Sequence, residues 1–195
     1  MRAVEYRGPY DIKVSRKKDP AIEHPDDVIL SVTRAAICGS DLHLLHGLIP
    51  DTRVGSTFGH EFTGMVEDVG KHVRNLQKGD RVAVPFNISC GTCFFCMRGL
   101  TANCENSNPN SDVVGGCFGY SHTTGGYEGG QAQYVRVPFA DVGPMKIASP
   151  ASSSRARRAR PRSSSGASTP FARAATSRSS ACTARRGTWC RSAPP

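Results

Sequence analysis

The chain has 195 residues, with 25 Lys and Arg against 16 Asp and Glu, which gives a formal net charge of +9. This excess is confined to one end: residues 1–147 carry 15 basic and 16 acidic side chains, whereas residues 148–195 carry ten Arg and no Lys, Asp or Glu. The split excludes a basic, nucleic-acid-binding globular domain as the default interpretation of the charge.

Short strands separated by Gly-rich turns dominate the elements that the sequence predicts. Alternating β-branched and apolar residues suit a half-buried pleated surface. On this basis we expect strands at residues 1–6, 11–14, 28–33, 62–69, 81–85, 131–137 and 145–147. We expect Gly64 to break the strand that contains it and Gly70 to close that strand. The pattern predicts a mostly β, barrel-like domain with short helices, of the α+β class.

Two segments between these strands have a different character. Residues 40–46 predict a short helix, which Ser40 or Asp41 caps and Gly47 ends. Residues 87–127 are rich in Cys, Gly and Asn and predict a long loop.

The last 48 residues differ in kind from the rest of the chain. Residues 148–195 contain no Val, Ile, Leu or Met, so they cannot bury enough apolar surface to offset the conformational entropy of folding. We expect a folded domain at residues 1–147 and a disordered Ser-, Ala- and Arg-rich tail at residues 148–195.

The sequence also indicates a compartment. The first residues lack the apolar stretch of a secretory signal, and no apolar run is long enough to span a membrane. We therefore expect a cytoplasmic protein without a membrane partner. In a reducing compartment, clustered cysteines favour metal binding over disulfides.

Four cysteines in the 87–127 segment give the strongest chemical signal. Their spacing is C-x2-C-x2-C-x7-C, at Cys90, Cys93, Cys96 and Cys104. Four thiolates can close a tetrahedral zinc site, and a closed site is structural because no position stays open for substrate. Disulfides, free buried thiols and an iron–sulfur cluster are the alternatives, although the spacing lacks the Cys-Pro ending of bacterial ferredoxins.

A second set of reactive side chains lies on two short segments: Cys38, Ser40, Asp41 and His43 on the first, and His60 and Glu61 on the second. Cys38 and His60 are suitable zinc ligands, and Asp41 can orient a ligand imidazole through a hydrogen bond. Ser40 and His43 can pass a proton to solvent. Taken singly, each residue also has a structural explanation, such as a buried thiol or a solvated charge.

The order of these motifs resembles a known family. Cys-Gly-Ser-Asp-x-His (38–43), Gly-His-Glu (59–61), Gly-Asp-Arg-Val (79–82) and the cysteine quartet are similar to those of the zinc-containing alcohol dehydrogenases of the medium-chain dehydrogenase/reductase superfamily. Residues 125–138 look like the glutathione-independent formaldehyde dehydrogenase branch. The resemblance runs from residue 1 to about residue 147.

The resemblance implies a GroES-like catalytic domain and a role for each residue. Cys38 and His60 match two ligands of a catalytic zinc, and Asp41 matches the acid that orients the ligand histidine. Among the catalytic residues, Ser40 and His43 match the hydroxyl and imidazole of the proton relay, and Glu61 matches the nearby acid that can approach the zinc transiently. The quartet matches a structural zinc site, in a segment at about residues 87–104 that we call the cysteine lobe. Members of the family transfer hydride between a small alcohol or aldehyde substrate and NAD(P). The resemblance also implies a possible homo-oligomer.

The chain departs from the family pattern in two respects. A third catalytic zinc ligand is expected soon after Ile147, yet no Asp, Glu or His follows Asp141, so we expect this zinc site to be weak or empty. The G-x-G-x-x-G turn of a Rossmann domain is absent, so we expect no NAD(P) site, no Rossmann domain and no turnover by this chain. We interpret residues 148–195 as a frameshifted translation.

Two other functions remain open from the sequence. One is a non-enzymatic zinc-binding module whose basic tail binds nucleic acid, a partner that we do not favour. The other is a related oxidoreductase acting on a polyol or threonine, which the motifs at residues 38–43 and 59–61 do not distinguish from an alcohol or formaldehyde dehydrogenase.

Overall fold

The computed structural model of the protein describes residues 1–49, 51–113 and 115–148. The chain divides into two units, residues 1–158 and 159–195, and every described residue belongs to the first. The tail predicted at residues 148–195, apart from Ala148, lies outside the described residues.

Strands form most of the regular structure, with a single α-helix among the described residues. In chain order the elements are β1 (Arg2–Gly8), β2 (Asp11–Arg16), β3 (Val28–Ala35), α1 (Gly39–Leu45), β4 (Phe62–Val69), β5 (Arg81–Val84), β6 (Asn87–Ile88), η1 (Cys96–Arg98), η2 (Thr101–Asn103), η3 (Glu105–Ser107), β7 (Gly116–Cys117), η4 (His122–Thr124), β8 (Tyr134–Val137) and β9 (Met145–Lys146). The predicted mostly β class is confirmed.

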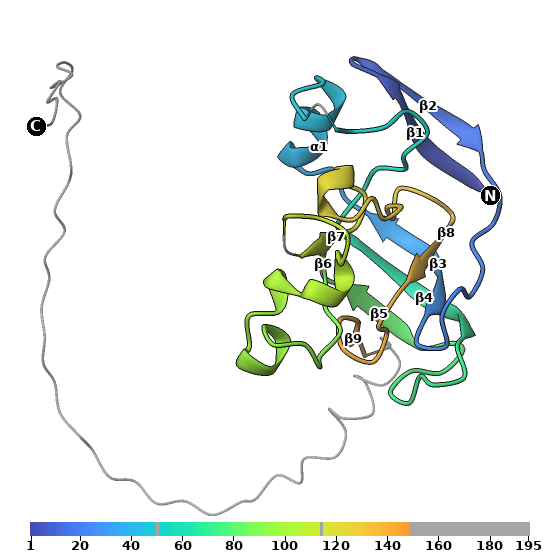
Figure 1. The fold of residues 1–195 in the computed structure, drawn as a ribbon. Helices are drawn as coiled ribbons and strands as arrows, with labels where there is room; N and C mark the ends of the chain where they lie inside the picture. The colour runs from blue at the N-terminus through green and yellow to red at the C-terminus, as the bar shows by residue number, and fades with distance from the viewer. Residues whose placement is uncertain (50, 114, 149–195) are drawn as a thin grey trace, which may run out of the picture. The chain divides into compact units, whose positions relative to one another are not determined.

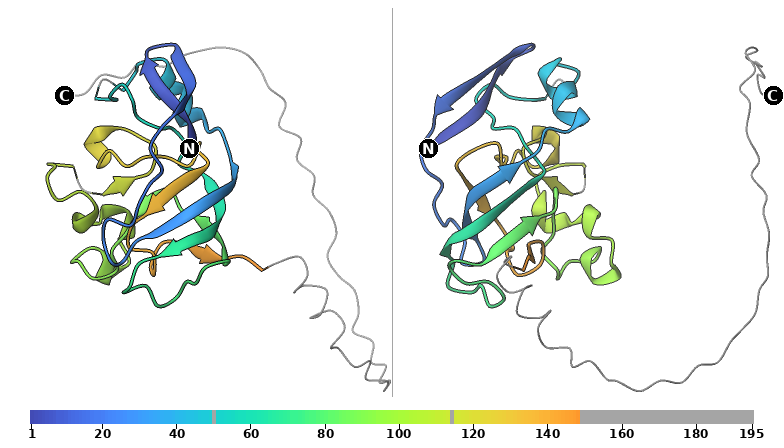
Figure 2. Two further views of the ribbon diagram at one scale, coloured as in Figure 1. Left: turned by 90° about the vertical axis from the view of Figure 1, so that its right-hand side faces the viewer. Right: turned by 180° about the vertical axis from the view of Figure 1, so that it is seen from behind.

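A five-stranded antiparallel sheet is the centre of the fold (Figure 1). Its strand order is β8-β3-β4-β5-β9, while β1-β2 and β6-β7 form separate two-stranded sheets. The views in Figure 2 show the β1-β2 hairpin and α1 toward one end of this unit, with β6, β7 and the cysteine lobe beside the central sheet.

The core lies on one face of the central sheet. Leu30 on β3 pairs with Val66 on β4 and with Val135 on β8, and all three side chains are at most 2% exposed. Burying an aliphatic side chain of this size contributes about 1.5–3 kcal/mol. Phe62 extends the core by meeting Phe118 edge to face at 5.3 Å, which ties the sheet to the segment after β7.

Gly64 does not break its strand, contrary to the prediction. β4 continues through it because the strand passes unusually close to its neighbour: a Cβ on Gly64 would lie 2.6 Å from the carbonyl oxygen of Ser31. The glycine therefore permits close backbone approach. Gly70 follows the end of β4 as predicted.

The predicted helix is present as α1, but its cap differs. Cys38 is the N-cap, and the Asp41 carboxylate accepts a hydrogen bond from the Cys38 amide at 2.9 Å, so Asp41 acts from the third helical position. Gly47 follows the C-cap with a φ of 71°. The start of α1 therefore places Cys38, a candidate metal ligand, next to the carboxylate of Asp41.

Two further boundaries differ from the predictions. The segment 87–127 contains the β6-β7 pair, so it is not a loop throughout. The strand predicted at residues 131–137 begins at Tyr134, because residues 129–131 bond instead to the backbone of residues 57–59. These bonds matter for the site, because they hold Gln131 beside the segment that carries His60.

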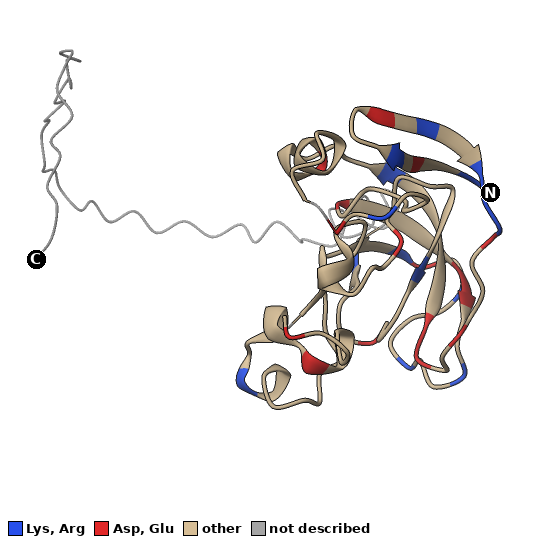
Figure 3. Cartoon of the chain, turned by 45° about the horizontal axis from the view of Figure 1, so that its top comes forward, with Lys and Arg blue, Asp and Glu red and all other residues tan. Residues whose placement is uncertain are grey.

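Charges of both signs are spread over the described unit, as Figure 3 shows. This mixture agrees with the near balance counted for residues 1–147. No helix among the described residues has both the length and the apolar character needed to cross a membrane.

Candidate metal centres

The four cysteines of the cysteine lobe converge on one point. Their sulfur atoms all lie within 4.8 Å of one another, and the side chains are at most 9% exposed. No cysteine in the described ranges forms a disulfide. Zinc–sulfur bonds of about 2.3 Å place tetrahedral sulfurs about 3.8 Å apart. The 4.0 Å between the sulfurs of Cys93 and Cys104 is close to this value, so the quartet fits a zinc ion.

Local turns bring these sulfurs together. Gly91 and Gly99 adopt φ values of 79° and 76°, which other residues rarely adopt, and they reverse the chain on either side of Cys93 and Cys96. Backbone amides then point at sulfur: the Cys93 amide donates to Cys90 Sγ at 3.4 Å, and the Cys96 amide donates to Cys93 Sγ at 3.5 Å. Such donors stabilise thiolate charge.

The thiols of the quartet differ in acidity. Burial disfavours the Cys90 thiolate, but hydrogen bonds from Thr92 and Cys93 outweigh burial and lower the Cys90 pKa to about 6. Burial and the neighbouring thiols raise the pKa of Cys96 to about 12. Because metal ligation requires thiolates, binding of a metal ion by the quartet displaces thiol protons.

A second group of metal-binding side chains lies where α1 and β4 begin. Donor atoms of Cys38, His60 and Glu61 lie within 4.8 Å of one another. Cys38 is half-buried at the helix start, His60 is 8% exposed, and Glu61 is exposed. The Ser40 amide and hydroxyl, followed by His60, lower the pKa of the Cys38 thiol. A thiolate, an imidazole and a carboxylate fit a zinc ion with three protein ligands.

Asp41 lies behind His60, as the sequence predicts for an orienting acid. Its Oδ1 is 3.4 Å from His60 Nδ1, and both side chains are almost buried. The neighbouring Asp41 carboxylate raises the His60 pKa to about 9 against the opposing effect of burial. Asp41 is itself held by the Cys38 amide at 2.9 Å and by the Gln131 side-chain amide at 3.2 Å.

A cavity of about 290 Å³ adjoins this second group. It is lined by Cys38, Ser40, His60, Glu61, Phe86, Cys117 and Tyr120. The Tyr120 ring meets the His60 imidazole edge to face at 6.2 Å. Ser40 lies 3.6 Å from the Cys38 sulfur, measured from Oγ to Sγ. His43 is exposed on α1 and is not part of the lining, so the structure does not bring it to the cavity wall.

Sequence reasoning missed four residues of this site: Phe86, Cys117, Tyr120 and Gln131. Cys117 and Tyr120 lie on the segment after the cysteine lobe. Gln131 reaches the site because its backbone bonds to residues 57–59. No local motif marks these contacts, because each depends on the tertiary fold. Only an unassigned cysteine at position 117 offered a signal.

Comparison with known proteins adds independent information. The family described as "Alcohol dehydrogenase GroES-like domain" matches residues 24–147. A zinc-type alcohol dehydrogenase-like protein, AdhB of Bacillus subtilis, is 54% identical over 147 residues, covering 75% of this chain and 39% of AdhB. Glutathione-independent formaldehyde dehydrogenase of Pseudomonas aeruginosa is 40% identical over 152 residues, covering 75% of this chain and 37% of that protein.

A solved structure gives the same picture. Alcohol dehydrogenase TADH from Thermus sp. ATN1 matches with a TM-score of 0.70 and 43% sequence identity, over 76% of this chain and 40% of the Thermus protein. The chain thus spans about two fifths of the length of the relatives it matches.

Proposed function

Because the chain belongs to the alcohol dehydrogenase GroES-like domain family, we propose that it supplies the zinc-binding and substrate-binding part of an alcohol or formaldehyde dehydrogenase. The observation that carries this proposal is the meeting of Cys38, His60 and Glu61 beside a cavity, with Asp41 behind the imidazole. A purely structural metal site has no need for an adjoining cavity.

Each residue has a role in this proposal. Cys38 and His60 hold the catalytic zinc, with the exposed Glu61 as a third donor. Because the ligand expected after Ile147 is absent, this site binds zinc more weakly than the quartet does. Asp41, whose Oδ1 lies 3.4 Å from His60 Nδ1, orients the His60 ring and makes the neutral imidazole a better ligand. When bound, zinc polarises the oxygen of an alcohol or aldehyde and makes the hydroxyl proton easier to remove.

Ser40 is the group best placed to relay that proton, because its Oγ can accept the proton while its own hydroxyl hydrogen passes on toward solvent. Its hydroxyl lines the cavity and approaches the Cys38 sulfur at 3.6 Å, so a substrate oxygen near the donors also lies near Ser40. His43 is exposed on the same helix and can accept the proton at the solvent side. Phe86 and Tyr120 line the cavity with aromatic rings, and its volume of about 290 Å³ favours a small substrate.

The quartet has a different role in the proposal. Cys90, Cys93, Cys96 and Cys104 hold a structural zinc that stabilises the cysteine lobe and takes no part in the reaction. Hydride transfer in the family uses NAD(P), whereas the 195 residues contain no G-x-G-x-x-G spacing. We therefore expect these residues to bind zinc without oxidising alcohols by themselves.

A chimera tests the proposed catalytic role. Residues 1–147 replace the matching part of the Pseudomonas aeruginosa formaldehyde dehydrogenase, which is 40% identical to this chain. We expect NAD-linked formaldehyde oxidation, and its loss when the same chimera carries Cys38→Ser. Zinc retained by the quartet reports that the domain is folded, so an inactive chimera that holds this zinc contradicts the proposal.

A second candidate function rests on the ten Arg in residues 148–195. In this alternative the chain is a non-catalytic zinc-binding module whose basic segment binds nucleic acid through phosphate contacts. The test is binding of labelled duplex DNA and RNA across a salt series, compared with a variant ending at residue 147. Equal binding by both proteins at low salt excludes this alternative.

A further inference from the structure

The four sulfurs of the quartet receive unequal numbers of hydrogen bonds. Cys90 Sγ is contacted by the Thr92 amide at 3.4 Å, the Thr92 hydroxyl at 3.5 Å, the Cys93 amide at 3.4 Å and the side-chain amide of Asn106 at 3.3 Å. Cys93 and Cys104 each accept one backbone amide, at 3.5 and 3.3 Å. Negative charge on the quartet is therefore best stabilised at Cys90.

Asn106 differs from the other donors because it lies outside the cysteine lobe. It sits on η3, two residues beyond Cys104, and its amide reaches back across the chain to Cys90. An amide nitrogen donates hydrogen bonds and does not accept them, so it suits a thiolate acceptor. The contact therefore adds a donor to Cys90 from outside the cysteine lobe.

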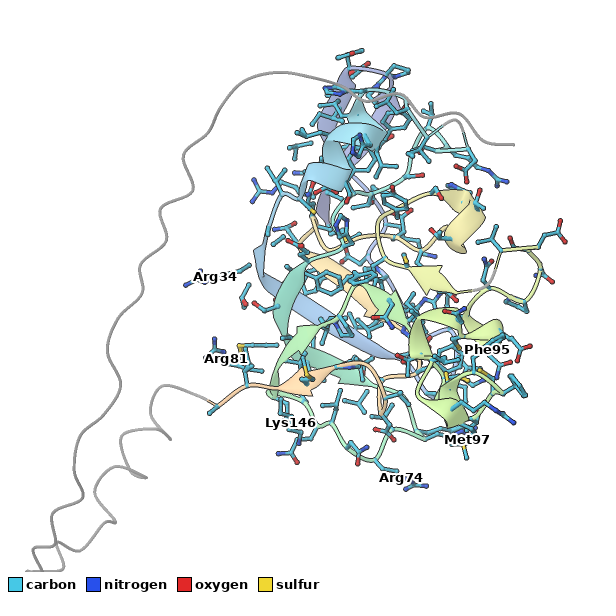
Figure 4. The ribbon with its side chains drawn as sticks, turned by 90° about the vertical axis from the view of Figure 1, so that its left-hand side faces the viewer. Arg34, Arg74, Arg81, Phe95, Met97 and Lys146 are labelled. Carbon is cyan, nitrogen blue, oxygen red and sulfur yellow. The ribbon has the colours of Figure 1, made fainter. Side chains whose placement is uncertain are left out.

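The turn that carries Asn106 is firmly held. Ser107 is 1% exposed, its hydroxyl donates to the Cys104 carbonyl at 2.9 Å, and its own carbonyl accepts the Tyr127 hydroxyl at 2.8 Å. These bonds anchor η3 on both the lobe side and the core side. Figure 4 shows sulfur atoms clustered in the loop that carries the labelled Phe95 and Met97.

We propose that Asn106 is a positioning residue of the structural zinc site, which fixes Cys90 Sγ and stabilises its thiolate through the side-chain amide. The inference rests on the proposed assignment of zinc to the quartet. Hydrogen-bonded partners of metal ligands commonly change metal affinity by 10- to 100-fold when they are removed. Asn106 is exposed, but its amide contacts the sulfur of Cys90, which is 8% exposed, and a hydrogen bond to a charged sulfur belongs to this class.

The test compares two variants with the same charge change. N106D keeps the shape of the side chain but replaces the donor by a carboxylate that repels the thiolate. N103D places the same charge one residue before Cys104, at an exposed Asn that makes no side-chain hydrogen bond to another described residue. Both are made in the full chain carrying Cys38→Ser, which disables the second metal group.

Zinc affinity is measured by competition with a chelator, and the cobalt(II)–thiolate absorption band is recorded for each protein. We expect N106D to bind zinc 10- to 100-fold more weakly, with a shifted cobalt band, and N103D to change affinity less than threefold. Asn106→Gln, which retains an amide, should recover part of the loss. N106A shows the effect without added charge if N106D does not fold.

The outcomes separate the two levels of inference. Equal zinc affinity and equal cobalt spectra for N106D, N106A and N103D overturn the role of Asn106 while leaving the quartet as a zinc site. Failure of the parent protein to bind zinc or cobalt with four thiolates overturns the zinc assignment, and the role of Asn106 with it.

Discussion

Gly59, which precedes His60, is the position where fold and site are most tightly coupled. Its φ is 101°, and a Cβ there would lie 2.5 Å from Gln131 Cγ and 2.7 Å from the Gln131 backbone nitrogen. That nitrogen donates to the Phe58 carbonyl at 2.9 Å, while the Gln131 side chain donates to Asp41. We expect Gly59→Ala to destabilise the domain and to disturb the orientation of His60.

The magnitude follows from two separate costs. A left-handed backbone costs a non-glycine residue about 1–2 kcal/mol. Crowding a packed site adds about 1–3 kcal/mol, because here backbone as well as a flexible side chain must move. The total of about 2–5 kcal/mol corresponds to a fall in Tm of about 4–20 °C for a protein of this size.

Gly55→Ala is the matched control. Gly55 has a φ of 96°, but a Cβ there would meet nothing within 4 Å. We expect only the backbone cost, a fall in Tm of about 2–8 °C. The assay is thermal unfolding of the zinc-loaded full chain, with metal content measured at both groups. Equal Tm values and equal metal content for the two variants would refute the argument that Gly59 is required by close packing.

Three further results are expected. Cys93→Ser should lose the zinc of the quartet and make the cysteine lobe sensitive to limited proteolysis, whereas Cys117→Ser should retain both the zinc and the resistance. Gln131→Leu removes a donor to Asp41, so cobalt binding at the second group should weaken about tenfold with the quartet unaffected; an unchanged second site would exclude a positioning role. The raised His60 pKa, about 9 against an ordinary 6.5, stabilises the metal-free fold below pH 6.5, and this contribution is lost as the pH rises toward 9. The difference in metal-free Tm between the wild type and His60→Gln should therefore shrink over that range, and a constant difference would show that His60 is not linked to Asp41.

The sequence predicted best what depends on local spacing. The C-x2-C-x2-C spacing is enough to bring sulfurs together, because two-residue turns with Gly91 determine where each thiol points. The strand β3 was likewise predictable, because its β-branched residues suit a central strand, and β3 pairs with β4 and with β8.

What the sequence did not predict depends on contacts between distant segments. Taken from the sequence alone, Gly64 predicts a break in its strand. In the structure, the carbonyl of Ser31 lies so close to Gly64 that only a residue without a side chain fits. The sequence predicts that Gln131 begins a strand. In the structure, residues 129–131 bond to residues 57–59, and the Gln131 side chain therefore lies against Asp41. Neither partner is visible until the sheet order is known.

The two metal groups also differ in the chain segments that bring their residues together, and this difference is relevant to their functions. The ligands of the quartet come from a short stretch of chain, with η3 as a brace and Phe139 packed against the cysteines. The second group needs the start of α1, the start of β4 and the Gln131 segment together, so it forms only when the central sheet has formed. A site built this way couples its geometry to the whole domain. These contacts support the proposed division between a structural zinc site formed by nearby residues and a catalytic zinc site that depends on the sheet.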